Sequence, residues 1–270
     1  MSLDRTMERP GARIRYRVGE GDGRAVVFTH GAGMDHTSFT ALAERVQEAG
    51  FRPVLWDQRG HGESTLDAHV RFRAADTLAD LGALLKELNL ARPILVGHSL
   101  GGNLSQAFVR AEPDRVAALI VIGATWNAGP LTSVERVALR LAAPALALIP
   151  ARRLPGLMAR ASAVTPGAIA ATEAVFARMP KARFLDVWRA TVSFVDPDDS
   201  YRTPVPLALM HGAEDRTGNI VSAMRRWALV EGIVAYVIED AGHLPMLDAP
   251  DETAHDLLEI LSLLPDTAPH

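Results

Sequence analysis

The chain has 270 residues, of which 48% are hydrophobic and 22% charged, and its formal net charge is −4. These values are typical of a globular protein with a sizeable core. Because no basic block stands out, we expect no nucleic-acid partner. The sequence contains no cysteine, which excludes disulfides, thiolate metal sites and a cysteine nucleophile.

The sequence has neither a targeting pattern nor a membrane-spanning pattern. Residues 1–5 lack the apolar core of a signal peptide. The longest apolar stretch, residues 137–149, is interrupted by Arg140 and Pro144 and is shorter than the roughly 20 residues that cross a bilayer. We therefore expect no membrane span and a cytoplasmic location.

The first half of the chain alternates strand and helix patterns. Ile14, Tyr16 and Val18 alternate with arginines, which predicts a half-buried strand with a solvated arginine face. Continuous apolar runs predict buried strands at residues 25–29, 53–56, 93–96 and 118–122. Helices are expected between these strands, at residues 38–49, 74–90 and about 100–110.

The alternation stops near Thr125 and resumes near Val205. Residues 125–201 are rich in alanine, proline, arginine and leucine, which predicts several short helices. We expect these helices to be cut by prolines, at positions 144, 150, 155, 166 and 180. Strand patterns return at residues 205–210 and 233–238, and a last helix is expected at 252–263.

This order of elements predicts an α/β fold with a mostly parallel sheet and helices on both faces. Residues 1–124 and 202–270 would form the core domain. Residues 125–201 would form a helical cap, or lid, at the carboxyl ends of the strands, where ligand crevices form in open α/β sheets.

The most informative segment is Gly97-His98-Ser99-Leu100-Gly101-Gly102, which follows an apolar run. Glycines on both sides of a serine allow a strained turn from a strand into a helix, with the hydroxyl at its apex. This pattern is typical of a nucleophile elbow. We therefore expect Ser99 to be a nucleophile at a helix N-terminus, where negative charge is favoured.

A serine hydroxyl needs a base and an acid that orients the base. Asp215 and His243 each follow a predicted strand, so both should converge on the edge where Ser99 lies. The order serine, acid, histidine is the one expected for this turn. Glu214 and Asp240 are the reserve acids, and residues 123–127 hold no acid.

The oxyanion that forms on the substrate needs fixed hydrogen-bond donors. The backbone N–H of Leu100 comes with the elbow, and the second donor should lie in the loop His30-Gly31-Ala32-Gly33. Ala32 is our choice, with Gly33 as the alternative.

Substrate-binding candidates are Trp126, at the junction of core and cap, Gly33 and His36, whose role stays open. Three other histidines, His30, His61 and His98, are interpreted as loop-bracing residues. No pair of histidines has helical metal-ligand spacing with a carboxylate, so no metal is assigned.

Taken together, these segments resemble the α/β-hydrolase family over essentially the whole chain, in particular its serine esterase and lactonase members with a helical cap. The matching residues are His30-Gly31, the loop Asp57–Ser64, the elbow Gly97–Gly102, Gly212 with Asp215, and Gly242-His243. The resemblance implies an eight-stranded, mostly parallel sheet, a cap after the sixth strand and no cofactor. Many relatives have proline where this chain has Gly33.

The resemblance also narrows the expected chemistry. Dehalogenases and epoxide hydrolases of the family carry aspartate at the elbow, which Ser99 argues against, and hydroxynitrile lyases usually add a lysine near the site. The best interpretation is hydrolysis of a carboxylic ester or lactone through an acyl-enzyme, and the apolar cap predicts a hydrophobic substrate. Alternatives are a carbon–carbon bond hydrolase acting on a vinylogous diketone, a cofactor-free oxygenase, and a non-catalytic ligand receptor. The oligomeric state is left open.

Overall fold

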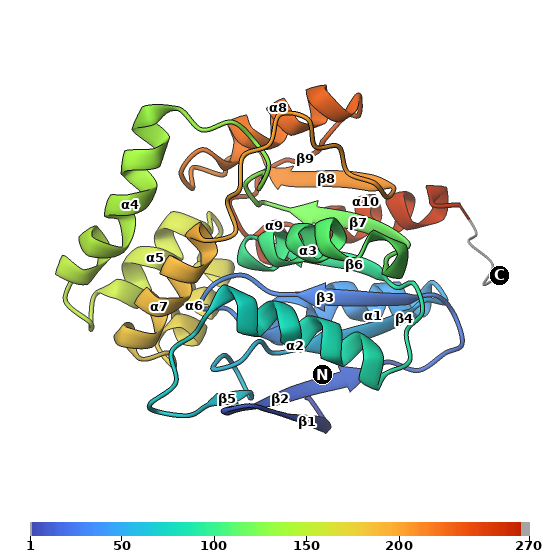
Figure 1. Cartoon of the computed structure of the whole chain (residues 1–270), viewed down its shortest axis with the longest axis horizontal. Helices are drawn as coiled ribbons and strands as arrows, with labels where there is room; N and C mark the ends of the chain where they lie inside the picture. The colour runs from blue at the N-terminus through green and yellow to red at the C-terminus, as the bar shows by residue number, and fades with distance from the viewer. Residues whose placement is uncertain (1, 266–270) are drawn as a thin grey trace.

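A computed structural model describes residues 2–265 of the chain. Within this range the chain forms a single sheet flanked by helices on both faces, with four more helices at one end (Figure 1). The strands are β1 (Arg5–Arg9), β2 (Ala12–Val18), β3 (Ala25–Thr29), β4 (Arg52–Trp56), β5 (Thr65–Leu66), β6 (Ile94–His98), β7 (Ala118–Ile122), β8 (Leu207–Gly212) and β9 (Tyr236–Ile238).

Eight of these strands follow one another in the order β1-β2-β4-β3-β6-β7-β8-β9, and the two-residue β5 pairs with β2. The pairs β1–β2 and β2–β4 are antiparallel, whereas every pair from β4 to β9 is parallel. The predicted α/β class and mostly parallel sheet are therefore confirmed. Strands β3, β6 and β7 are fully buried, as parallel strands covered on both faces should be.

The helices of the core lie on two sides of the sheet, and their apolar faces build two separate hydrophobic layers. Helices α2 (Ala74–Glu87), α3 (Leu100–Ala111) and α8 (Ile220–Glu231) contribute to one layer. Helices α1 (Thr40–Glu48), α9 (Pro245–Asp248) and α10 (Pro250–Leu263) contribute to the other. Two short 3-10 turns, His36–Phe39 and Pro113–Arg115, complete the core.

Four helices lie between β7 and β8, at the carboxyl ends of the parallel strands (Figure 1). They are α4 (Ser133–Leu148), α5 (Leu154–Ser162), α6 (Pro166–Phe176) and α7 (Lys181–Val192); we call them the helical insertion. Pro166 begins α6, Pro155 lies in the first turn of α5, and Pro180 caps α7. The prediction that Pro144 cuts a helix is wrong, because it lies inside α4.

The structure also adds elements that the sequence patterns did not predict. Strand β1 is short and mostly exposed, so it lacks a hydrophobic alternation to detect. Helix α8 was missed between two predicted strands, although its buried face carries Ile220, Met224 and Trp227. Along residues 2–265 no helix combines the length and the apolar character needed to cross a membrane.

Candidate active site

Ser99 occupies a strained turn between β6 and α3. Its backbone has φ +51° and ψ −119°, a region that residues with a side chain rarely adopt. The turn is tied to the sheet by the Ser99 N–H, which donates to the Ile122 carbonyl at 3.0 Å, and to α3 by the Asn103 N–H, which donates to the Ser99 carbonyl at 3.0 Å. Strain held in this way is typical of functional residues.

The glycines around Ser99 are required by close packing. A Cβ on Gly97 would lie 2.4 Å from the Gly101 carbonyl oxygen, and one on Gly101 would lie 2.0 Å from the Thr29 carbonyl oxygen. Both distances are far below van der Waals contact. The β6–α3 turn and strand β3 can therefore approach this closely only because these two residues lack side chains.

The structure brings Asp215 and His243 together. Asp215 follows β8 and His243 follows β9, and the Asp215 Oδ2 lies 2.9 Å from the His243 Nδ1. The other carboxylate oxygen, Oδ1, accepts the Thr217 N–H at 2.8 Å. Burial raises the pKa of Asp215, but the charge and hydrogen bond of His243 outweigh it, so the pKa lies below its usual value. Asp215 is thus held as a carboxylate against the imidazole.

Ser99 and His243 face the same cavity, which lies beneath the helical insertion. Its core-side lining also includes Gly31, Ala32, Met34, Thr217 and Leu244. The insertion contributes Met158 and Ser162 from α5, Phe176 from α6, and Phe184 and Trp188 from α7. The described lining contains neither lysine nor arginine, so the cavity suits an uncharged apolar group.

Residues Gly31–Met34 form a turn beside Ser99. The Met34 N–H donates to the Gly31 carbonyl at 3.1 Å, and Gly33 has φ +76°, as the third position of a type II turn requires. A Cβ on Gly33 would lie 2.6 Å from the Phe176 ring and 3.0 Å from the Phe184 ring. Gly33 thus lies under the insertion, and Ala32 is the loop residue that lines the cavity. Leu100 begins α3, where backbone N–H groups lack an intrahelical acceptor.

The three other predicted loop histidines contact backbone groups. The His98 Nε2 lies 2.8 Å from the His243 carbonyl oxygen, and the His30 Nε2 accepts the Gln58 N–H at 3.0 Å. The His61 Nδ1 lies 3.2 Å from the Arg59 carbonyl oxygen. Burial, together with the nearby charge of His243, lowers the pKa of His98 to about 3; burial and His30 do the same for His61. Both rings are therefore neutral near neutral pH.

His36 lies outside the lining of the Ser99 cavity and binds Asp57. Its Nδ1 is 3.0 Å from the Asp57 Oδ2, and its backbone N–H donates to the Asp57 Oδ1 at 2.7 Å. The Glu63 N–H also donates to Asp57, at 2.7 Å. Burial alone would lower the pKa of His36, but Asp57 outweighs it and raises the pKa. This geometry orders the loop from Asp57 to Ser64.

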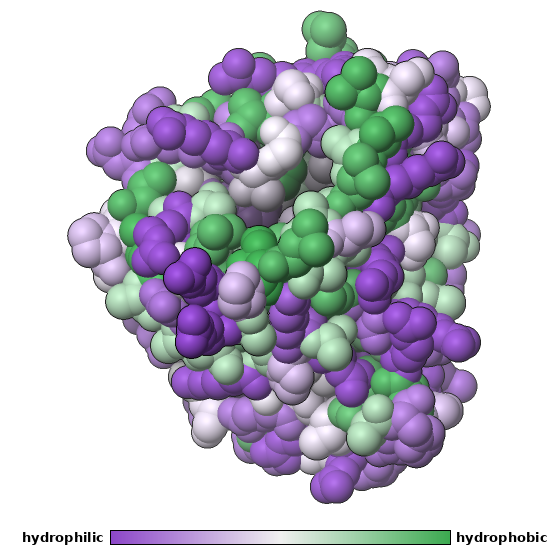
Figure 2. Space-filling view, turned by 90° about the vertical axis from the view of Figure 1, so that its left-hand side faces the viewer, coloured by the Kyte–Doolittle hydropathy of each residue, from purple (hydrophilic) through white to green (hydrophobic). Residues whose placement is uncertain are grey.

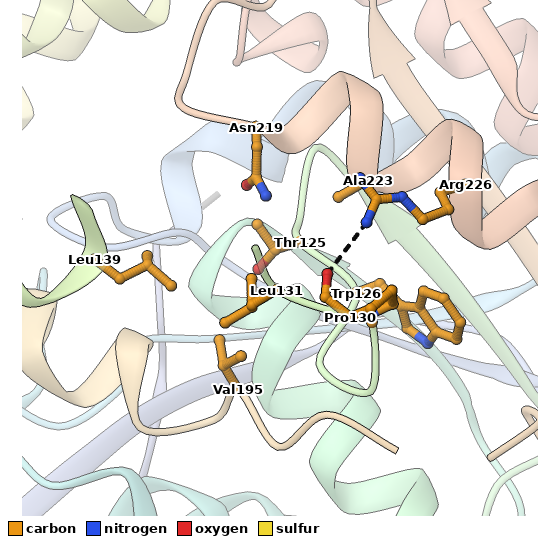
Figure 3. Close-up of a pocket in the computed structure, with 10 residues that line it drawn as sticks. Thr125, Trp126, Pro130, Leu131, Leu139, Val195, Asn219, Ala223 and Arg226 are labelled. Carbon is orange, nitrogen blue, oxygen red and sulfur yellow. Dashed lines mark hydrogen bonds between the residues drawn. The ribbon is translucent and has the colours of Figure 1, made fainter. Parts of the chain in front are cut away.

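Trp126 also lies outside the Ser99 cavity. Its ring stacks on Trp227, with centroids 6.1 Å apart and planes 5° apart. It borders a different, smaller pocket between the loop after β7, α4 and α8, which Leu139 and Asn219 also line (Figure 3). The Arg226 guanidinium closes this pocket by donating to the Pro130 carbonyl at 3.1 Å (Figure 3). Of the predicted site residues, the structure thus gathers Ser99, Asp215, His243, Ala32 and Leu100, with Gly33 under the insertion, and leaves Trp126 and His36 apart.

Sequence reasoning did not single out Thr217, Ser162 or Leu244 as parts of the site. Thr217 could have been found, because a residue two positions after an aspartate often donates its N–H to that side chain. Ser162 and Leu244 carry no such local signal. The Leu244 N–H donates to the Ser162 carbonyl at 3.1 Å, a contact made only when α5 packs on the core.

Comparison with known proteins assigns the chain to a family. Residues 26–256 match the model of the alpha/beta hydrolase family, so the chain belongs to that family. A region of 112 residues is 36% identical to the sn-1-specific diacylglycerol lipase ABHD11 of Mus musculus, covering 40% of this chain and 36% of that protein. A region of 115 residues is 34% identical to the putative carbamate hydrolase RutD of Variovorax paradoxus, covering 42% and 43%. These matches thus span less than half of those curated relatives.

Solved structures share the fold over nearly the whole chain. An esterase from Thermogutta terrifontis superimposes with a TM-score of 0.78 at 24% identity, covering 96% of this chain and 97% of that one. The enol-lactonase of Burkholderia xenovorans gives a TM-score of 0.79 at 20% identity, covering 96% and 100%. At these identities the likeness establishes the fold, and the chemistry must be argued from the site.

Proposed function

We propose that this protein is a serine hydrolase that cleaves a hydrophobic carboxylic ester or lactone. The observation that carries the proposal is the strained backbone of Ser99 in a cavity that it shares with His243, whose ring is bound by Asp215 at 2.9 Å. A strained serine beside a carboxylate-bound imidazole is the arrangement that acyl transfer requires.

In this mechanism His243 accepts the proton of the Ser99 hydroxyl as its oxygen attacks the substrate carbonyl. Asp215 stabilises the imidazolium that forms. The backbone N–H groups of Leu100 and Ala32 hold the oxyanion, a contribution worth about 3–4 kcal/mol for each donor. The imidazolium then protonates the leaving alcohol, which leaves an acyl group on Ser99. A water molecule deprotonated by His243 hydrolyses the acyl-enzyme and returns the serine.

The lining of the cavity supports an uncharged, apolar substrate. Met158, Phe176, Phe184 and Trp188 all border it. In this conformation the space measures about 40 Å³, room for about three water molecules. A substrate therefore enters when helices of the insertion part, and we assign these helices the role of a lid.

Carbon–carbon bond hydrolysis by the same residues is the main competing activity. A region of 115 residues is 32% identical to an Escherichia coli hydrolase whose name describes a dicarboxylate substrate. Two carboxylates would need cationic partners, and the described lining of the Ser99 cavity offers none. The cavity therefore favours the ester or lactone.

Labelling with a fluorophosphonate tests the proposal directly. The probe should modify the wild-type protein at Ser99, and the Ser99→Ala variant should lose both labelling and turnover of p-nitrophenyl esters while remaining folded. A panel of esters, lactones, thioesters and vinylogous diketones then identifies the bond cleaved, with long or cyclic acyl groups preferred over acetate. Turnover retained by Ser99→Ala would refute covalent catalysis by this serine and favour a base-only reaction at His243.

A further inference from the structure

The outer face of α4 carries an apolar stripe that no described part of the chain covers. Val134, Val137, Leu141 and Leu148 are exposed to 78%, 54%, 58% and 86%. Their spacing of three, four and seven residues places them on one side of the helix. Figure 2 views the molecule from the side on which the insertion lies, and a continuous hydrophobic band crosses that face. Exposed apolar patches of this kind mark interaction sites.

The same segment carries an excess of arginine over acidic residues although the chain as a whole is acidic. Residues 133–163 contain five arginines and one acidic residue, Glu135, whereas the formal net charge of the chain is −4. All five arginines are exposed, and none of them forms an ion pair within residues 2–265. They are Arg136, Arg140, Arg152, Arg153 and Arg160. Arg140 lies next to the stripe, and Arg136 lies one helical turn before it on the same flank of the helix, farther from the stripe.

The helix is held to the protein by its inner face, which leaves the stripe outward. At the N-terminal end the Asn219 amide donates to Glu135 at 2.6 Å, and Leu139 points into the pocket drawn in Figure 3. At the C-terminal end the Lys181 ammonium donates to the Ala147 and Ile149 carbonyls, both at 2.5 Å. The stripe therefore has no role in fixing α4 on its own core.

We propose that α4 and the α4–α5 turn dock this protein on an anionic lipid surface. An amphipathic helix that combines an apolar stripe with flanking arginines lies in the plane of the lipid headgroups, with its apolar side buried. The unpaired arginines contribute the electrostatic attraction. A second copy of the chain fits less well, because a two-fold contact places the same patch on both partners and would bring like-charged arginines together.

The docking surface lies on the helical insertion, which covers the Ser99 cavity. Its role there rests on the proposed esterase function. A crevice that Lys181 lines, together with Ala151, Leu154 and Pro155, shares Met158, Phe176 and Phe184 with the Ser99 cavity. Lys181 also binds the carbonyls of Ala147 and Ile149, on either side of Leu148 in the chain. An apolar ester dissolved in the lipid can pass along the shared side chains to Ser99 when the helices part. Lipid contact at α4 and access to the site then involve the same helices.

Vesicle sedimentation tests the docking. The wild-type protein should bind vesicles of phosphatidylcholine mixed with phosphatidylglycerol, bind pure phosphatidylcholine far more weakly, and be released by salt. The pair Leu141→Glu and Leu148→Glu should reduce binding at least tenfold. The pair Arg136→Gln and Arg140→Gln should reduce it about fivefold for each arginine. All variants should turn over a short, soluble ester at the wild-type rate.

A matched control places the same charge change on another apolar surface. Leu229 and Val234 are exposed to 81% and 85% and lie outside the insertion, so the pair Leu229→Glu and Val234→Glu should leave vesicle binding unchanged. Equal losses in both double-glutamate variants would overturn the proposal. It would also fail if the wild type ignores anionic vesicles, or if sedimentation equilibrium shows a dimer that only the α4 variant disrupts.

Docking and catalysis fail in distinguishable ways. Turnover of a soluble ester without vesicle binding would refute the docking proposal and leave the proposed hydrolase function standing. Vesicle binding without labelling at Ser99 would refute the hydrolase function and leave the docking proposal standing.

Discussion

The His98 Nε2 lies 2.8 Å from the backbone carbonyl oxygen of His243. His98 directly precedes Ser99 in the chain, so this contact joins the turn of the proposed nucleophile to the loop of the proposed base. Because the pKa of His98 is lowered to about 3, the ring is neutral and its Nε2 must carry the hydrogen that the carbonyl accepts. His98 is therefore a positioning residue that sets the distance between two segments that lie 145 residues apart in the chain.

Replacing His98 should reveal this role. His98→Phe removes the donor at similar volume and should lower kcat about 10²-fold with little change in KM, because a shift of about 1 Å at a reacting group costs that much. His98→Gln keeps a donor and should restore most of the rate. Steady-state kinetics on a soluble ester checks both variants.

The matched control for His98 is another buried histidine. His61→Gln also removes a neutral buried ring; it should lower stability but leave kcat within a few fold of wild type. If His61→Gln and His98→Phe lower kcat alike, the effect is a general loss of packing and the positioning role is refuted.

Asp215 should be the acid that orients His243. Asp215→Asn replaces the carboxylate 2.9 Å from the His243 Nδ1 with an amide that cannot stabilise the imidazolium, and kcat should fall about 10⁴-fold. Asp240, a reserve acid in the sequence, is exposed and has φ +51°, a conformation that asparagine tolerates. Asp240→Asn should therefore retain near wild-type kcat. The reverse result would reassign the acid.

How much the sequence could predict depended on whether the signal was local. The buried strands and the Ser99 elbow were predictable because apolar runs and flanking glycines are read from neighbouring residues. The predicted acid, Asp215, follows the strand β8 and lies against His243, since the carboxyl ends of parallel strands meet at one edge. The place of Trp126 was not predictable, for the opposite reason. It lies outside the Ser99 cavity and stacks on Trp227, a contact that depends on helix α8, which the sequence patterns did not predict.

Proline and histidine illustrate the same limit. Pro144 predicts a helix break, yet α4 continues through it, held at its ends by Asn219 and Lys181. The role of His36 could not be predicted from the sequence because its partner, Asp57, is 21 residues away. Contacts between distant segments decide both cases, and neither leaves a periodic trace in the sequence.

Acid should destabilise the protein through its buried neutral histidines. The pKa of His61 is lowered by burial to about 3, whereas the pKa of a histidine in an unfolded chain is about 6.5. Between these values only the unfolded chain binds the proton, so stability falls with decreasing pH by up to about 1.4 kcal/mol per pH unit for this residue. Urea unfolding of wild type and His61→Gln at several acidic pH values should show that the variant has the shallower slope.

His36 should change stability with pH in the opposite direction to His61. Its pKa is raised because Asp57, with Asp35 and Glu63, outweighs burial. Its contribution to stability is therefore complete below the unfolded value of about 6.5 and is lost as the pH rises through the folded value. The stability difference between wild type and His36→Gln should be larger at mildly acidic pH than in alkaline buffer. A difference that grows towards alkaline pH would contradict the assigned sign.

Gly33 should couple the position of the helical insertion to that of the turn Gly31–Met34, which carries the proposed oxyanion donor Ala32. Gly33→Ala places a methyl group at φ +76° and within 2.6–3.0 Å of the Phe176 and Phe184 rings. We expect a loss of stability of about 1–3 kcal/mol and a fall in kcat, because the turn that carries Ala32 must shift. Gly218 is the matched control, since it has φ +56° but nothing within 4 Å of an added Cβ. Gly218→Ala should cost only the backbone conformation and leave kcat unchanged. If both variants lose the same stability and neither loses activity, contact between the insertion and the loop does not position the oxyanion donor, and Leu100 would have to act with another group.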